Sequence, residues 1–63
     1  MNWEEFFQVA IEEEHKAEAR YGDAAAQAVD PKLKDIFEKL QYEESIHADL
    51  LEIERKKWLK KQA

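Results

Sequence analysis

The chain has 63 residues, no cysteine and a net charge of −5. A single core of this size buries little apolar surface, so we expect a metal or self-association to stabilise the fold, and disulfides and thiolate metal sites are excluded. The negative charge argues against general nucleic-acid binding, and no stretch is long and apolar enough to span a membrane. The N-terminus lacks the basic and apolar regions of a signal peptide, which predicts a cytoplasmic protein.

One glycine and one proline interrupt a sequence rich in Ala, Glu, Lys and Leu, which predicts an all-α chain forming a single domain over 1–63. Asn2 can cap the first helix, with Glu5 as the partner in a capping box. We predict a helix over 3–29, a turn at 29–30 and a helix over 31–61. Asp30 precedes Pro31, a pair that ends one helix and begins the next. Helices joined by so short a turn fold back as an antiparallel hairpin.

Both predicted helices carry a 4-3 repeat of core-facing positions. The first helix contributes Trp3, Phe7, Ala10, Glu14, Ala17, Tyr21, Ala24 and Ala28. The second contributes Leu33, Phe37, Leu40, Glu44, His47, Leu51, Glu54 and Trp58. A further apolar set lies beside this repeat on the second helix, namely Ile36, Ile46, Leu50 and Ile53. A lone hairpin cannot cover both sets, so we expect two hairpins to dimerise into a four-helix bundle.

Three ionisable residues occupy core-facing positions of this repeat: Glu14, Glu44 and His47. Counted from the turn at a rise of about 1.5 Å per residue, all three fall at one level of the hairpin. Such a group is costly to bury unless something neutralises it, and a metal ion would do so. In a two-fold dimer the group becomes four Glu and two His, the ligand pattern of ferritin-like di-iron and di-manganese proteins. This ligation suits iron or manganese, with zinc as a further occupant.

Other polar residues receive simpler interpretations. Glu12 and His15 repeat the Glu-x-x-His spacing but point away from Glu14, so we predict that they lie on the surface. Glu54 lies two turns beyond His47, and we expect it to pair with a Lys or Arg. Gly22 and the neighbouring alanines predict a surface on which helices approach closely.

The motif residues resemble the rubrerythrin-type hairpins of the ferritin-like superfamily, and most closely the encapsulated ferritins. The similarity covers residues 10–55 and is carried by three segments: Glu14-His15-Lys16-Ala17-Glu18-Ala19-Arg20-Tyr21, Asp30-Pro31-Lys32-Leu33 and Tyr42-Glu43-Glu44-Ser45-Ile46-His47-Ala48. The resemblance implies that Glu14, Glu44 and His47 are iron ligands of a ferroxidase centre across a subunit interface, with Tyr21 beside it. It further implies dimers that assemble into a ring, housed inside an encapsulin shell.

The expected function is therefore that of a ferroxidase, which oxidises two Fe(II) per dimer interface with dioxygen for iron storage or detoxification. Glu14 and Glu44 would bind and bridge the iron, His47 would complete each ion's ligands, and Tyr21 would orient a ligand or serve only as a core aromatic. Two alternatives stay open. One is a peroxide-reducing di-iron protein. The other is a structural helical oligomer in which the buried Glu and His set only register and oligomeric state.

Overall fold

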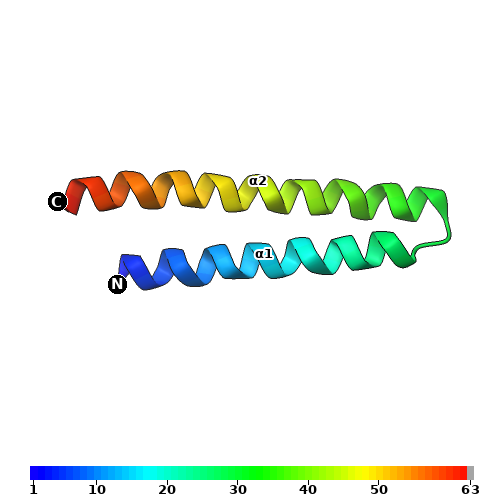
Figure 1. Cartoon of the computed structure of the whole chain (residues 1–63), viewed down its shortest axis with the longest axis horizontal. Helices are drawn as coiled ribbons and strands as arrows, with labels where there is room; N and C mark the ends of the chain where they lie inside the picture. Colours follow the sequence, from blue (N-terminus) through cyan, green and yellow to red (C-terminus); the bar gives the residue numbers. More distant parts are fainter. Residues whose placement is uncertain (63) are drawn as a thin grey trace.

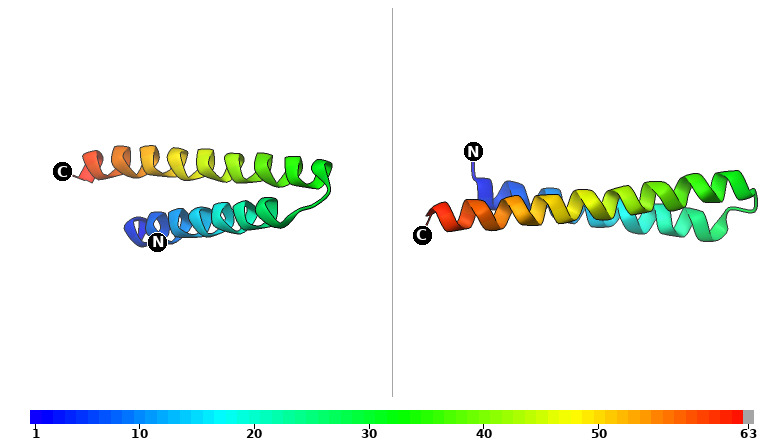
Figure 2. Two further views of the ribbon diagram at one scale, coloured as in Figure 1. Left: turned by 45° about the vertical axis from the view of Figure 1, so that its right-hand side comes forward. Right: turned by 90° about the horizontal axis from the view of Figure 1, so that it is seen from above.

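Two antiparallel helices form the chain, as predicted, in a computed structural model that describes residues 1–62 (Figure 1). Helix α1 spans Trp3–Gln27 and helix α2 spans Pro31–Gln62. The hairpin measures 50 × 15 × 14 Å, and the three views agree that the helices run side by side from the turn to the two termini (Figures 1 and 2). No helix within residues 1–62 combines the length and apolar character needed to cross a bilayer.

The helix boundaries follow from capping interactions. The Asn2 Oδ1 atom accepts a hydrogen bond of 3.1 Å from the Glu5 amide, so this part of the predicted capping box is confirmed. At the start of α2, the Asp30 Oδ1 atom accepts one of 2.9 Å from the Lys32 amide. Lys60 and Lys61 lie in the last turn of α2, where positive charge is favourable.

Helix α1 ends earlier than the predicted residue 29. Ala28 has an extended backbone, with φ −71° and ψ 125°, while its amide still donates a 2.9 Å hydrogen bond to the carbonyl of Ala24. The connection therefore occupies residues 28–30. A reversal that leads into Pro31 needs extended residues before the proline, and the helix ends two residues earlier than predicted to provide them.

Aromatic contacts and an ion pair hold the two ends of the hairpin together. At the open end, the Phe7 and Trp58 rings lie 6.3 Å apart across the helices, and Arg55 Nη2 donates a 3.2 Å hydrogen bond to Glu4 Oε1. Near the turn, the rings of Tyr21 and Phe37 stack with centroids 6.3 Å apart and planes inclined by 20°. These contacts fix the register of α1 against α2.

Few side chains are fully buried within the hairpin. Among residues 1–62 only Ile11, Ala25 and Ala48 are, with exposed fractions of 8%, 5% and 1%. None of these three residues belongs to the predicted 4-3 repeat, although each is adjacent in sequence to one of its members. They are buried because they point directly at the neighbouring helix. Most of the repeat is half-buried and borders an uncovered side of the hairpin.

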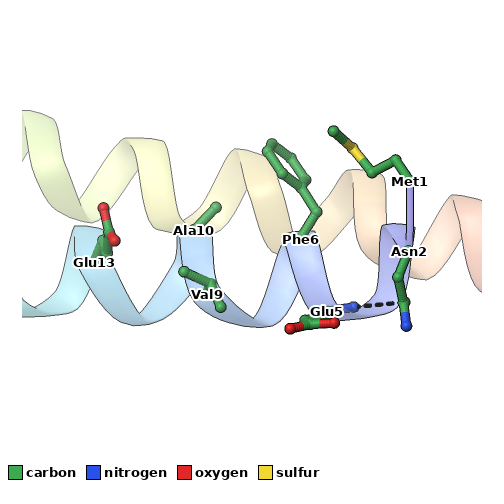
Figure 3. Close-up of a pocket in the computed structure, with 7 residues that line it drawn as sticks. All are labelled: Met1, Asn2, Glu5, Phe6, Val9, Ala10 and Glu13. Carbon is green, nitrogen blue, oxygen red and sulfur yellow. Dashed lines mark hydrogen bonds between the residues drawn. The ribbon is translucent and has the colours of Figure 1, made fainter.

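That uncovered side, which we call the site face, is apolar at both ends of the hairpin. Its exposed members are Trp3, Phe6, Leu33 and Ile36. With about 100° of rotation per residue, these side chains leave their helices on the same side as His47. Figure 3 shows Phe6 extending from one side of α1, while Glu5 lies on the opposite side.

Candidate metal centre

The structure brings the three predicted ligands together near the middle of the hairpin. Helix α1 contributes Glu14, and α2 contributes Glu44 and His47, which are three residues apart and therefore share a face. The Nδ1 atom of His47 lies 3.4 Å from Glu14 Oε2 and 3.7 Å from Glu44 Oε2. One ligand atom from each residue lies within 4.8 Å of the others. Within residues 1–62 this is the one group of His, Cys, Asp and Glu side chains with such geometry.

The cluster is enclosed by the hairpin on one side and open on the other. The side chains of Glu14 and Glu44 are 26% and 20% exposed, whereas that of His47 is 51% exposed. His47 therefore lies at the rim, on the site face. The opening leaves room for ligands that do not come from this chain.

One buried oxygen in the cluster has no hydrogen-bond partner. Oε2 of Glu14 is shielded from solvent and accepts no hydrogen bond, although His47 Nδ1 is only 3.4 Å away. A buried carboxylate oxygen in this condition costs about 1 to 3 kcal/mol. A cation bound among the three side chains would satisfy this oxygen, so the residues present fit a metal ion.

The Glu14 carboxylate also perturbs Glu44. The pKa of Glu44 is raised above its ordinary value, chiefly because its protonated form can donate a hydrogen bond to the neighbouring Glu14 carboxylate, and then because of desolvation and repulsion from the Glu14 charge. His47 opposes this shift. Glu44 therefore releases its proton less readily than an isolated Glu, and a divalent cation would compete with that proton for the site.

The donor set limits the chemistry of the site. Two carboxylates and one imidazole provide three ligand atoms in their closest arrangement, fewer than the four that zinc takes or the six of an octahedral ion. A metal bound by one hairpin would thus keep open coordination positions. These positions face the uncovered side of the hairpin, where a second set of side chains or a small molecule has access.

Tyr21 is not part of the Glu14, Glu44 and His47 group. It lies seven residues, or about 10 Å along the helix axis, from Glu14. Its ring is half-buried and stacks on Phe37. Within the hairpin, Tyr21 therefore packs as an aromatic residue, and its role beside the metal stays a prediction.

The remaining polar residues lie where we predicted them from the sequence. Glu12 and His15 are exposed, and His15 Nδ1 lies 3.5 Å from Glu18 Oε1. Glu54 forms a 3.4 Å ion pair with Lys57, which confirms the predicted pairing with a basic residue. Sequence analysis did not predict the ion pair between Arg55 and Glu4, because it depends on the register between helices.

Comparison with known proteins adds no assignment. No family model matches the chain, and no curated protein or solved structure matches it significantly. The resemblance to ferritin-like hairpins therefore rests on the motif residues and their spacing.

Proposed function

We propose that this chain is one half of a ferroxidase whose di-iron centre is shared between two copies of the hairpin. The observation that carries the proposal is the convergence of Glu14, Glu44 and His47 within 4.8 Å on an uncovered face. This arrangement provides part of a metal site and leaves the rest to be supplied from outside the hairpin. A second copy is the simplest source, because it brings the same three residues.

Two-fold symmetry supports a shared site. An axis that passes through the site, perpendicular to the helices, doubles the group to four carboxylates and two imidazoles. Each of two helices then supplies a Glu and each of the other two a Glu-x-x-His, as in di-iron bundles. Four carboxylates also balance the charge of two divalent ions, which a single hairpin with two carboxylates cannot do.

The shape of the site face supports the same arrangement. The two-fold axis would place the open end of one hairpin against the turn end of its partner. The open end carries the large side chains Trp3 and Phe6, which are 46% and 43% exposed. The turn end carries the small side chains Ala24, on α1, and Ala28, directly after it, at this face. Large side chains would meet small ones, which favours close packing across the dimer.

The ligand chemistry favours iron or manganese. Calcium and magnesium prefer shells made only of oxygen ligands, whereas His47 offers a nitrogen. A structural zinc site would use thiolates or more imidazoles, and the chain has no cysteine. Mixed carboxylate and imidazole ligation with open positions suits Fe(II), which is the substrate in the proposed reaction.

The reaction balances with dioxygen as the oxidant. Each of two Fe(II) ions loses one electron, and dioxygen takes both electrons and two protons to give hydrogen peroxide and two Fe(III). Glu14 and Glu44 would bind and bridge the ions, holding them within about 4 Å of each other so that one oxidant draws an electron from each. His47 would complete each ion's protein ligands. Tyr21 would act only by orienting a ligand, since its ring packs on Phe37.

One observation favours the structural alternative. The Nδ1 atom of His47 lies near both Glu14 and Glu44, so a protonated His47 would offset part of the carboxylate charge without any metal. In that case the cluster would set only the register of the helices. Assembly and stability would then be indifferent to iron.

The test is anaerobic loading with Fe(II) followed by admission of air, with Fe(III) absorbance and assembly size recorded together. We expect oxidation to exceed the protein-free rate, to saturate at two irons per dimer, and to disappear in Glu14→Gln. Glu12→Gln is the matched control, since Glu12 is exposed and points about 160° away from Glu14 around α1. Repeating the reaction with hydrogen peroxide and no dioxygen identifies the preferred oxidant. A native chain that neither accelerates oxidation nor responds to iron in its assembly would contradict the proposal.

A further inference from the structure

The open end of the hairpin carries a recess that the proposed metal site does not use. It includes Trp3 of the site face and lies at the end where both termini are found (Figure 1). Its volume is about 280 Å³. We call it the aromatic recess, and the residues that line it are Trp3, Phe7, Glu54, Lys57, Trp58 and Lys61.

Helical spacing brings the lining residues to one place. Trp3 and Phe7 are four residues apart on α1, and the four residues from α2 follow the spacing i, i+3, i+4 and i+7. The contact between Phe7 and Trp58 joins the two sets across the helices. Phe7 lies seven residues, or about 10 Å along the helix axis, from Glu14, so the recess is separate from the metal ligands.

Three aromatic rings form the walls of the aromatic recess. The ring centroid of Phe7 lies 6.5 Å from that of Trp3 and 6.3 Å from that of Trp58, with planes inclined by 42° and 47°. Rings tilted in this way do not stack face to face, so parts of their faces stay open to a flat guest. A cavity of about 150 Å³ can hold benzene, so the larger recess has room for one flat bicyclic ring.

The rim of the aromatic recess is positively charged. Lys57 lies 3.4 Å from Glu54, which compensates part of its charge. Lys61 is exposed and forms no ion pair within residues 1–62. Two ammonium groups and one carboxylate leave a charge of +1 beside the rings, in a chain whose net charge is −5. The recess is therefore a local positive site on an acidic protein.

Aromatic rings also attract cations, so a quaternary ammonium ligand is the competing interpretation. Glu54 is the one carboxylate that lines the recess within residues 1–62, and it is already paired with Lys57. A cation in the recess would meet the charge of Lys61 without a free carboxylate to offset it. The charges at the rim thus favour an anionic ligand over a cationic one.

We propose that the aromatic recess binds a small planar aromatic anion, such as an aromatic carboxylate. The ring of the ligand would lie against the three aromatic walls, and its negative group would pair with Lys61 and Lys57 at the rim. This site goes beyond the proposed iron chemistry, because it needs neither a metal nor a second copy. In the proposed dimer the recess would face the turn end of the other hairpin, so an occupied recess would oppose closure. Only this consequence rests on the proposed function.

The first test uses 2-naphthoate as the probe and the metal-free chain in the presence of EDTA. Both tryptophans of the chain line the recess, so their two indole N–H signals in proton–nitrogen NMR spectra report on it directly. We expect both signals to shift saturably, with a dissociation constant of about 1 mM for a ligand of this size in an open recess. Indole signals that do not shift would overturn the proposal. Tighter binding of phenyltrimethylammonium would also overturn it, by assigning the recess to cations.

A lysine substitution tests the recognition of charge. Lys61→Gln should weaken 2-naphthoate binding about threefold, because it removes the uncompensated charge at the rim. Lys56→Gln is the matched control, since Lys56 is exposed about 140° around α2 from Lys61, and we expect it to bind as the native chain does. Equal affinities of the native chain and both variants would show that the anionic group is not recognised, against the proposal.

Trp58→Leu tests the contribution of the rings. It removes one wall and should weaken 2-naphthoate binding about tenfold, with the Trp3 signal as the remaining reporter. Circular dichroism shows whether this variant stays helical, and if it does not, Lys61→Gln decides the test. A helical Trp58→Leu chain with the native affinity would contradict binding in the recess.

The two proposals fail in different ways, and adding Zn(II), which is diamagnetic and is not oxidised, separates them. If both are right, Zn(II) raises the assembly mass and weakens 2-naphthoate binding. If only the shared di-iron site is wrong, Zn(II) changes neither quantity, while 2-naphthoate still binds and Lys61→Gln still weakens it. If only the ligand site is wrong, Zn(II) raises the mass, and 2-naphthoate leaves the indole signals of the metal-free chain unchanged.

Discussion

Replacing Glu14 with Gln should change the stability of the metal-free and metal-loaded protein in opposite directions. The substitution keeps the size of the side chain and removes one negative charge beside Glu44. It also places an amide where the unpartnered Oε2 atom is buried, and an amide nitrogen can donate to the neighbouring carboxylate. We expect the free energy of unfolding of the metal-free protein to rise by about 1 kcal/mol, the lower end of the cost of an unsatisfied buried group.

The metal-loaded protein should respond the other way. At a Mn(II) concentration one hundred times the dissociation constant, binding stabilises the native protein by about 2.7 kcal/mol. For a chain of this length, that corresponds to a rise in Tm of roughly 10 to 20 °C. Glu14→Gln loses one of three ligands per hairpin, so most of this rise should disappear. The variant would then be more stable than the native protein without metal and less stable with it.

Circular dichroism during thermal unfolding measures this reversal in the order of stability. The chain concentration is held fixed, and both proteins are measured with and without Mn(II). Glu12→Gln removes the same charge from an exposed position and should stay within about 0.5 kcal/mol of the native protein in both conditions. If Glu14→Gln lowers stability equally in both, the Glu14 carboxylate acts through its contact with His47 alone. The metal-site interpretation would then be refuted.

Two further predictions concern Glu44 and Gly22. The raised pKa of Glu44 means that the folded metal-free protein binds a proton more tightly than the unfolded chain, so this contribution is present at low pH and is lost as the pH rises through the raised pKa. Urea unfolding of the native chain at pH values below and above the raised pKa should show this loss, and Glu44→Gln should not show it. The affinity for Mn(II) should rise with pH. Gly22→Ala should stabilise the hairpin by roughly 0.5 to 1 kcal/mol through helix propensity, because the added Cβ meets only the end of the flexible Gln41 side chain, with Nε2 at 2.7 Å. Lower stability in urea would show instead that Gln41 is held in place.

The sequence predicted the hairpin because its signals are local. Asn2, Asp30 and Pro31 act on the backbone within a few residues, and the start of each helix follows from them. The meeting of Glu14 with Glu44 and His47 was also predictable. It required only the position of the turn and the rise per residue, which together place the three at one level.

The features that the sequence did not predict depend on how each helix is rotated about its own axis. The 4-3 repeat is a good guide to the half-buried residues, yet Ile11 and Ala48 are the residues that point straight at the other helix. Helix rotation also decides which residues Tyr21 contacts, and in the structure its ring stacks on Phe37, two turns from Glu14. Rotations of a few tens of degrees separate these arrangements, and a periodic pattern does not resolve them.

The small core links stability, assembly and metal binding in the proposed protein. A hairpin in which only three apolar residues of 1–62 are buried, two of them alanine, gains little from burial and would rely on contacts with other copies. The site face cannot close without bringing four carboxylates together, so its closure is opposed by charge until cations enter. Fe(II) would then act as substrate and as the agent that completes the dimer. Oxidation to Fe(III) would alter the charge at the same interface, so assembly size should be followed through turnover as well as at equilibrium.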